Sequence, residues 1–314
     1  MKLLARANHF VSSVSKFITE SRWRHLFTAG LVLMSVLIIA GILMGNWETL
    51  VAFDWQITPI WLLIGLLLLL VNFALNAWVW HLLSDKLVAS HNARFNIKVW
   101  CYANLLRRIP GTVWFVAGRA MQYEKIGVSK LRVSILSGIE LALILGAGLL
   151  TGLVALPILI LTPAFQETLK GSWLLIPIFV LVGLLLHPRV LGKLWGRLGQ
   201  SDLQEQPTWR DISLWVGLFV VAWVTGGLTL FSTINFVHSL PISEFIPILG
   251  IWVVANTVSV AGALTIGGFG LREISLTVLL SQIVPAPVAL VISLLMRVIW
   301  LAAELLGALV SLLL

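Results

Sequence analysis

Several stretches of the sequence are apolar over about the length that a helix needs to cross a membrane. A spanning helix requires about 20 mainly apolar residues. A soluble domain carries about 25% charged residues, whereas this chain of 314 residues carries 11% and is 59% hydrophobic. Its polar side chains are therefore too few to coat a water-soluble fold. The sequence predicts an all-α, polytopic integral membrane bundle of about six to eight spans, with apolar stretches at 27–45, 58–80, 134–161, 173–187, 212–235 and 286–314.

The positive charges gather in three segments. Of 21 Lys and Arg residues, 18 fall in residues 1–26, 81–132 and 188–211. The positive-inside rule makes these segments cytoplasmic. We therefore expect a multi-pass protein of the cell inner (plasma) membrane with a cytoplasmic N-terminus. Because spans separate the basic segments, the charge pattern argues against nucleic-acid binding.

The predicted organisation is a cytoplasmic amphipathic helix in residues 1–25, followed by a single transmembrane domain, residues 26–314. Two segments in that domain are broken, about 99–118 by a Pro-Gly pair and about 246–284 by a glycine-rich turn. We interpret both as re-entrant hairpins, the first entering from the cytoplasmic side and the second from the outer face. A competing interpretation makes 246–264 a full span and reverses the final helix. Broken segments in both halves of a chain are typical of transporters with a central binding site.

Ionisable residues near these breaks are the candidates for ligand binding, since charges inside a membrane usually face a partner or a cavity. A helix that starts after a break offers free N–H groups to an anion, and arginine binds phosphate bidentately. The alternative is that the arginines are interfacial anchors and the glycines allow close helix packing. The predicted ligand-binding set is Arg107, Arg108, Pro110, Gly111, Arg119, Glu140, Gly267, Gly268, Gly270, Arg272, Glu273 and Arg297.

The sequence allows specific predictions about the ion-pair partners of three glutamates. Glu140 is interpreted as the ion-pair partner of one of the arginines, with a proton relay as the alternative. Arg297 and Glu304, seven residues apart on one helix face, are expected to form a structural ion pair or to be local partners of Glu273.

Enzyme signatures are absent from the sequence. The six histidines lack metal-ligand spacing, and there is no nucleophile elbow, P-loop or dinucleotide fingerprint. A single cysteine, Cys101, excludes an internal disulfide. We therefore predict no catalytic residue, no metal and no cofactor.

The two broken segments resemble a known family. Residues 108–111 (Arg-Ile-Pro-Gly), Gly118-Arg119 and Glu140 resemble one signature of the lysylphosphatidylglycerol synthase transmembrane-region family, and residues 267–273 (Gly-Gly-Phe-Gly-Leu-Arg-Glu) with Arg297 resemble a second. The family usually has proline before the double glycine, where this chain has Ile266. The resemblance implies a flippase-like membrane region of the multiple-peptide-resistance type, without the soluble synthase domain.

The predicted function is transbilayer translocation of an anionic lipid or lipid-linked molecule. Arginines and half-helix N-termini would hold its head group, so a membrane lipid is the expected substrate and the chain is not expected to be an enzyme. Two alternatives stay open at this point. One is a membrane enzyme acting on a polyprenyl-phosphate or lipid head group, and the other is an accessory subunit of a lipid or glycan synthesis complex. A glycosyltransferase, a lipid-synthesis enzyme or a second copy of the chain (a homodimer) are the protein partners that these interpretations allow.

Overall fold

The computed structural model describes residues 37, 40–106, 113–161, 187, 190, 207–266 and 270–313. The chain divides into two compact units, Met1–Ala52 and Phe53–Leu314. The predicted amphipathic helix, most of the predicted spans 27–45 and 173–187, and both chain breaks at 107–112 and 267–269 lie outside the described residues.

The described residues form helices and no strand. Five helical stretches are long and apolar enough to cross a membrane, so the predicted helical membrane bundle is confirmed. In the first unit lies α3 (Trp47–Ala52). The second unit contains α4 (Pro59–Val88), α5 (Ala93–Leu106), α6 (Val113–Glu124), α7 (Lys130–Leu161), α11 (Trp209–Val237), the 3-10 turn η2 (Ile242–Glu244), α12 (Phe245–Ile266), α13 (Leu271–Leu280) and α14 (Ala286–Leu313).

Local sequence explains where these helices end. The helix predicted at 58–80 continues to Val88, because the polar residues that follow the apolar run remain helical until Ala89 adopts a left-handed conformation. At the start of α11, Thr208 and Asp211 form a capping box, in which each side chain satisfies a backbone N–H of the other. The predicted spans 134–161 and 286–314 match α7 and α14 closely.

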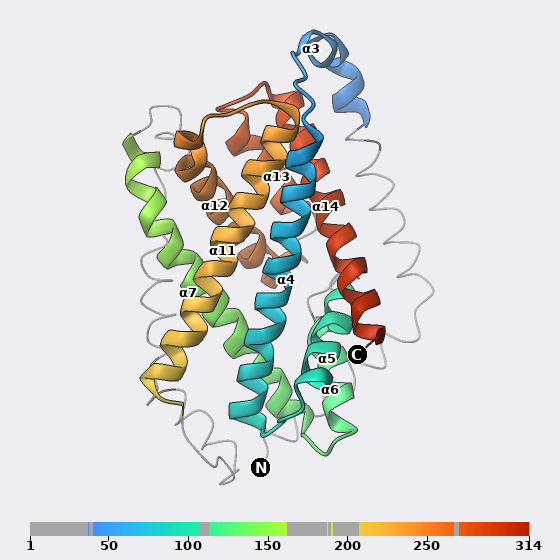
Figure 1. Cartoon of the computed structure of the whole chain (residues 1–314), viewed down its shortest axis with the longest axis vertical. Helices are drawn as coiled ribbons and strands as arrows, with labels where there is room; N and C mark the ends of the chain where they lie inside the picture. The colour runs from blue at the N-terminus through green and yellow to red at the C-terminus, as the bar shows by residue number, and fades with distance from the viewer. Residues whose placement is uncertain are drawn as a thin grey trace. The chain divides into compact units, whose positions relative to one another are not determined.

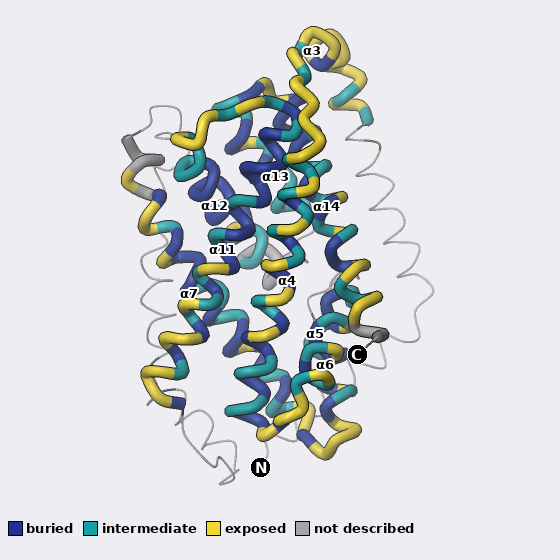
Figure 2. Tube along the Cα trace, in the orientation of Figure 1, coloured by how far each residue is buried: buried dark blue, intermediate teal, exposed yellow. Residues whose placement is uncertain are grey.

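The second unit exposes apolar side chains and buries polar ones. Along α4, Ile60, Leu63, Leu67 and Val71 are exposed at helical spacing, whereas Asn72 is buried (Figure 2). A contiguous apolar surface of this kind indicates contact with another apolar phase. The burial pattern therefore agrees with a multi-pass membrane protein.

Helices α4 and α11 make the most extensive contact in the second unit and run antiparallel (Figure 1). Small residues allow this approach, because Gly65 of α4 faces Ser232 and Thr229 of α11. At one end the backbone N–H of Gln56 donates to the carbonyl of Val237 over 3.0 Å. Small residues at contacts between helices are typical of membrane proteins.

The final helix runs in the same direction as α4 (Figure 1). Trp300 of α14 contacts Phe73 in the middle of α4, with ring centroids 5.8 Å apart, and each residue lies 14 positions after the start of its helix. Helices α12 and α13 form a hairpin whose two outer ends lie at the end of the unit where α4 begins. The direction of α14 agrees with the hairpin interpretation of residues 246–284. Re-entrance itself stays a prediction, because the stretch Ile242–Val260 is long and apolar enough to cross alone.

Two tryptophan rings lie directly against glycines of a neighbouring helix. A Cβ atom added to Gly226 of α11 would come within 2.5 Å of Nε1 of Trp252 on α12. A Cβ added to Gly148 of α7 would come within 2.6 Å of the ring of Trp223 on α11. These contacts leave no space for a side chain.

Replacing Gly226 by alanine is therefore expected to destabilise the protein by about 1–2 kcal/mol, because overpacking costs about 1–3 kcal/mol and exceeds the gain in helix propensity of about 0.5–1 kcal/mol. Gly217 lies on the same helix with nothing within 4 Å of an added Cβ, so Gly217→Ala is the matched control and should be neutral or slightly stabilising. Thermal unfolding of the purified variants measures both effects. Equal stability of the two variants would contradict the tight contact with Trp252.

Candidate functional site

A buried ion pair joins α6 to α7. Arg119 NH1 lies 2.5 Å from Glu140 Oε2, and NH2 lies 3.3 Å from Oε1. Arg119 is 0% exposed and Glu140 is 1% exposed. The indole N–H of Trp100 on α5 donates to Glu140 Oε1 over 3.0 Å. This confirms the prediction that Glu140 pairs with one of the arginines.

The guanidinium of Arg119 is also enclosed by aromatic rings. Its Cζ lies 3.8 Å from the ring centroid of Trp80 and 5.3 Å from that of Phe115, within the range of cation–π attraction. Among the described residues, its Nε has no hydrogen-bond acceptor. The ring of Trp80 and the carboxylate of Glu140 together hold Arg119 inside the protein.

Tyr123, one turn after Arg119, connects α6 to α4 and α5. Its hydroxyl lies 2.8 Å from Ser84 Oγ and 2.7 Å from Asn96 Oδ1, and it accepts the indole N–H of Trp80 over 3.1 Å. Burial raises the pKa of Tyr123 to about 12, so the phenol stays protonated at neutral pH. The network fixes the helix that carries Arg119.

A second cluster of charges surrounds Glu273 in the first turn of α13. Arg297 of α14 lies 3.0 Å from Glu273 Oε1, and Arg272 lies 3.6 Å from the same oxygen. Arg272 also lies over the ring of Trp300, 5.0 Å from its centroid. The structure thus confirms that Arg297 is a partner of Glu273. Helix α13 starts at Leu271, and Gly270, with a φ of 83°, is its N-cap residue and provides no capping side chain.

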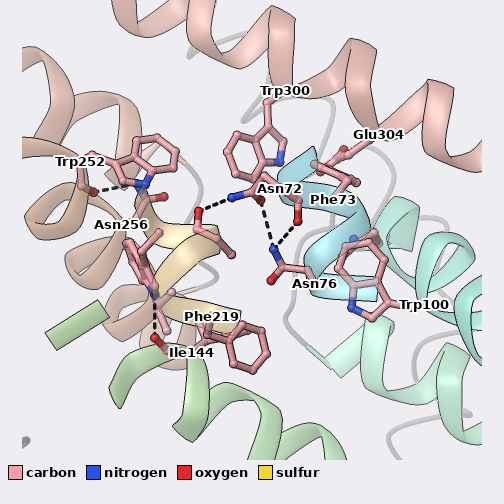
Figure 3. A pocket seen from close by; sticks show the side chains of 14 residues that line it. Asn72, Phe73, Asn76, Trp100, Ile144, Phe219, Trp252, Asn256, Trp300 and Glu304 are labelled. Carbon is pink, nitrogen blue, oxygen red and sulfur yellow. Dashed lines mark hydrogen bonds between the residues drawn. The ribbon is translucent and has the colours of Figure 1, made fainter. Parts of the chain in front are cut away.

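A cavity of about 160 Å³ lies inside the bundle between α4, α5, α7, α11, α12 and α14. Asparagines and tryptophans dominate its lining, and Figure 3 shows Asn72 and Asn76 between Trp100 on one side and Trp300 on the other. The described residues that line it are Asn72, Phe73, Asn76, Trp100, Asn104, Ile144, Phe219, Ala222, Trp223, Trp252, Asn256, Val260, Trp300 and Glu304.

The lining asparagines differ in how much of their hydrogen-bonding capacity the protein uses. Asn72 donates to the carbonyl of Ala222 and to Thr225 Oγ1, and it accepts from Asn76. For Asn76 and Asn256, bonds from the described residues use only the Nδ2 group. The side chain of Asn104, 5% exposed, makes no hydrogen bond to any described residue. The cavity therefore presents amide groups that the protein leaves available.

Each of the two charged clusters contacts a tryptophan that lines this cavity. Trp100, which donates to Glu140, lines the cavity, and so does Trp300, which lies beneath Arg272. Phe73 packs between the two tryptophans, with centroid separations of 5.7 and 5.8 Å. Of the predicted site residues, Glu140 and Arg272 thus contact tryptophans that line the cavity. Arg119 pairs with Glu140, Arg297 pairs with Glu273, and Gly270 is the N-cap of α13. None of these six residues lines the cavity itself. Arg107, Arg108, Pro110, Gly111, Gly267 and Gly268 lie outside the described residues.

Sequence reasoning missed most of the cavity, although a short pattern marks it. The pattern Trp-x-x-Ala-Asn or Trp-x-x-Ala-Glu occurs at residues 100–104, 252–256 and 300–304, on α5, α12 and α14. In each copy the tryptophan and the polar residue line the cavity, and the alanine is fully buried. Residues four apart share one helix face, so each copy provides an aromatic wall and a polar group together. Two of the copies lie in the segments predicted to be re-entrant.

Comparison of the chain with protein-family models, with curated proteins and with solved structures finds no match. In the described part of the chain, no group of three or more His, Cys, Asp or Glu residues could hold a metal ion. The functional argument therefore depends on the geometry of the cavity and its flanking charges.

Proposed function

We propose that this protein translocates an anionic lipid or lipid-linked molecule across the cell inner membrane. The observation that carries the proposal is the polar cavity among apolar helices, two of whose lining tryptophans contact the arginine clusters. The lipid tails would remain in the bilayer beside the bundle while the head group passes through it. The resemblance to the lysylphosphatidylglycerol synthase transmembrane region agrees with this function, and the positive-inside rule favours a cytoplasmic N-terminus.

The position of the polar groups supports a ligand pathway. An unsatisfied amide buried in an apolar environment costs at least about 1–3 kcal/mol, and ionisable groups inside spans usually face a substrate pathway or a partner. Asn104 and Glu304 both line the cavity from within the bundle.

The cluster around Glu273 supports an anionic head group. Two guanidinium groups share this one carboxylate, and the three side chains carry a net charge of +1. They lie at the N-terminus of α13, where backbone N–H groups favour negative charge. Arg272 lies over Trp300, which lines the cavity. A single ligand could therefore place its phosphate at this cluster and a neighbouring group inside the cavity.

We assign the Arg119–Glu140 pair a positioning role. Arg119 is fully buried, bidentate to Glu140 and absent from the cavity lining. Glu140 in turn orients Trp100, whose ring forms one cavity wall. The pair would therefore fix the shape of the site, and the head group would be bound by the second cluster.

The direct test uses purified protein in liposomes that contain phospholipids labelled with a fluorophore on an acyl chain, so that the head group is unmodified. Dithionite added outside bleaches only the outer leaflet. We expect faster loss of protected fluorescence than in protein-free vesicles for anionic lipids, measured with and without an imposed proton gradient or membrane potential. Rates equal to those of protein-free vesicles under every condition would refute the proposal.

A further inference from the structure

We propose that the cavity binds the hydroxyl groups of a polyol head group, such as glycerol or a single sugar ring, while the attached phosphate lies at the Arg272–Glu273–Arg297 cluster. This inference rests on the proposed lipid function and defines the class of head group. It draws on three features of the cavity: the unused hydrogen-bonding groups, the aromatic walls and the size.

The unused hydrogen-bonding groups match hydroxyls better than phosphate. Asn76 and Asn256 form hydrogen bonds with described residues through their Nδ2 groups, so their side-chain carbonyl oxygens stay available as acceptors. Asn104 offers one acceptor and two donor hydrogens to the cavity. A phosphodiester, as in phosphatidylglycerol, has only acceptor oxygens at neutral pH, so it could not satisfy these carbonyls. A hydroxyl donates and accepts, and adjacent hydroxyls can therefore satisfy both parts of an amide.

The aromatic walls of the cavity suit the C–H groups of a polyol. Glu304 is the one ionisable residue among those that line the cavity in the described part of the chain. The rings of Trp100, Trp252 and Trp300 present apolar faces, against which the C–H groups of a polyol can pack. An ammonium group would be attracted by the aromatic faces and by Glu304, but it would leave the NH₂ group of Asn104 unsatisfied.

The size of the cavity suits a small head group. Its volume of about 160 Å³ is close to that of a cavity of about 150 Å³ that binds benzene. This space accommodates glycerol or one ring. The phosphate of such a lipid would then lie outside the cavity, beyond Trp300, where Arg272 is located.

The test measures binding, separately from transport, with short-chain dioctanoyl lipids and the intrinsic tryptophan fluorescence of the full-length protein. We expect phosphatidylglycerol and phosphatidylinositol to bind at least about tenfold more tightly than phosphatidic acid and phosphatidylserine, since a site built to pair hydroxyls rejects a ligand that lacks them. Asn104→Leu, similar in size but apolar, should reduce this ratio to about one. Asn46→Leu replaces an exposed asparagine of the first unit and should leave the ratio unchanged.

If Asn104 has a structural role, Asn104→Leu should lower the thermal stability. We expect instead that this variant keeps the thermal stability of the wild type, because the side chain of Asn104 makes no hydrogen bond to any described residue. If this variant nevertheless unfolds, Asn256→Leu provides a second test, because the Nδ2 bond of Asn256 reaches only the carbonyl of Trp252 on its own helix.

Several outcomes would overturn the inference. Equal binding of all four anionic lipids indicates a cavity that holds only water, and tighter binding of phosphatidylcholine indicates an aromatic site for a cation. Either result leaves the proposed transport intact if the liposome assay is positive. Polyol-selective binding without transport in any liposome condition would instead refute the proposed function and retain the binding site.

Discussion

Replacing Glu140 by glutamine is expected to lower the free energy of unfolding by about 3–5 kcal/mol, or to prevent folding, because removal of one partner leaves the other charge buried and uncompensated. Arg119 is fully buried and stacks on Trp80, so it cannot reach water to recover its solvation. The change also replaces the carboxylate that accepts the Trp100 indole N–H. Chemical or thermal unfolding of purified variants in detergent measures the loss.

Two further variants separate burial from the simple loss of a charge. Glu124, with a side chain 55% exposed, pairs with Lys130 over 3.1 Å near the end of α6. Because exposed ion pairs contribute about 0–1 kcal/mol, Glu124→Gln should have little effect. The double variant Arg119→Met with Glu140→Leu removes both charges and should recover most of the stability lost in Glu140→Gln. Wild-type stability of Glu140→Gln alone would contradict the buried pair.

Replacing Arg272 by alanine should reduce transport of an anionic lipid about 10- to 100-fold. This range corresponds to the loss of one charge-assisted interaction, worth about 1.5–3 kcal/mol. Folding should be retained, because Arg297 still lies 3.0 Å from Glu273 when the ion pair of Arg272 with Glu273 and its stacking on Trp300 are removed. The liposome assay gives the rate, and thermal unfolding of the same preparation gives the stability.

Matched variants make this second result specific. Arg272→Lys keeps the charge but lacks the planar fork of donors, so its transport rate should be intermediate. Arg210, exposed in the first turn of α11, is the control arginine, and Arg210→Ala should transport as the wild type does. An unfolded Arg272→Ala together with normal transport by Arg272→Lys would indicate a structural anchor and count against head-group binding.

The sequence predicted the helices well because their signals are local. Apolar runs of membrane-spanning length marked α4, α7, α11 and α14. The start of a short helix after the glycine-rich turn was predicted for the same reason, and α13 begins there. Even the pairing of Glu140 with an arginine followed from local reasoning, since a charge inside a span needs a partner. The identity of that partner, Arg119, required the structure.

The cavity could not be predicted in this way, because it is built from residues up to 232 positions apart, from Asn72 to Glu304. An isolated asparagine in an apolar helix is compatible with a structural hydrogen bond, and Asn72 makes such bonds. Only the packing of α5 and α12 shows that Asn104 and Asn256 line the same space. Their shared Trp-x-x-Ala-Asn pattern becomes meaningful once both copies are seen around one cavity.

The amino-acid sequence was therefore sufficient to predict the class of protein, the helices and the places where charge interrupts apolar segments. These properties depend on the hydrophobicity and charge of neighbouring residues, because each segment partitions between water and lipid according to its own composition. The tertiary structure decided how those charges are used. It enclosed Arg119 with Glu140, placed Arg272 and Arg297 on one carboxylate and brought both clusters against tryptophans that line one polar cavity. The physical reason is that these contacts join residues far apart in the sequence, and only the packing of the helices determines which of them meet.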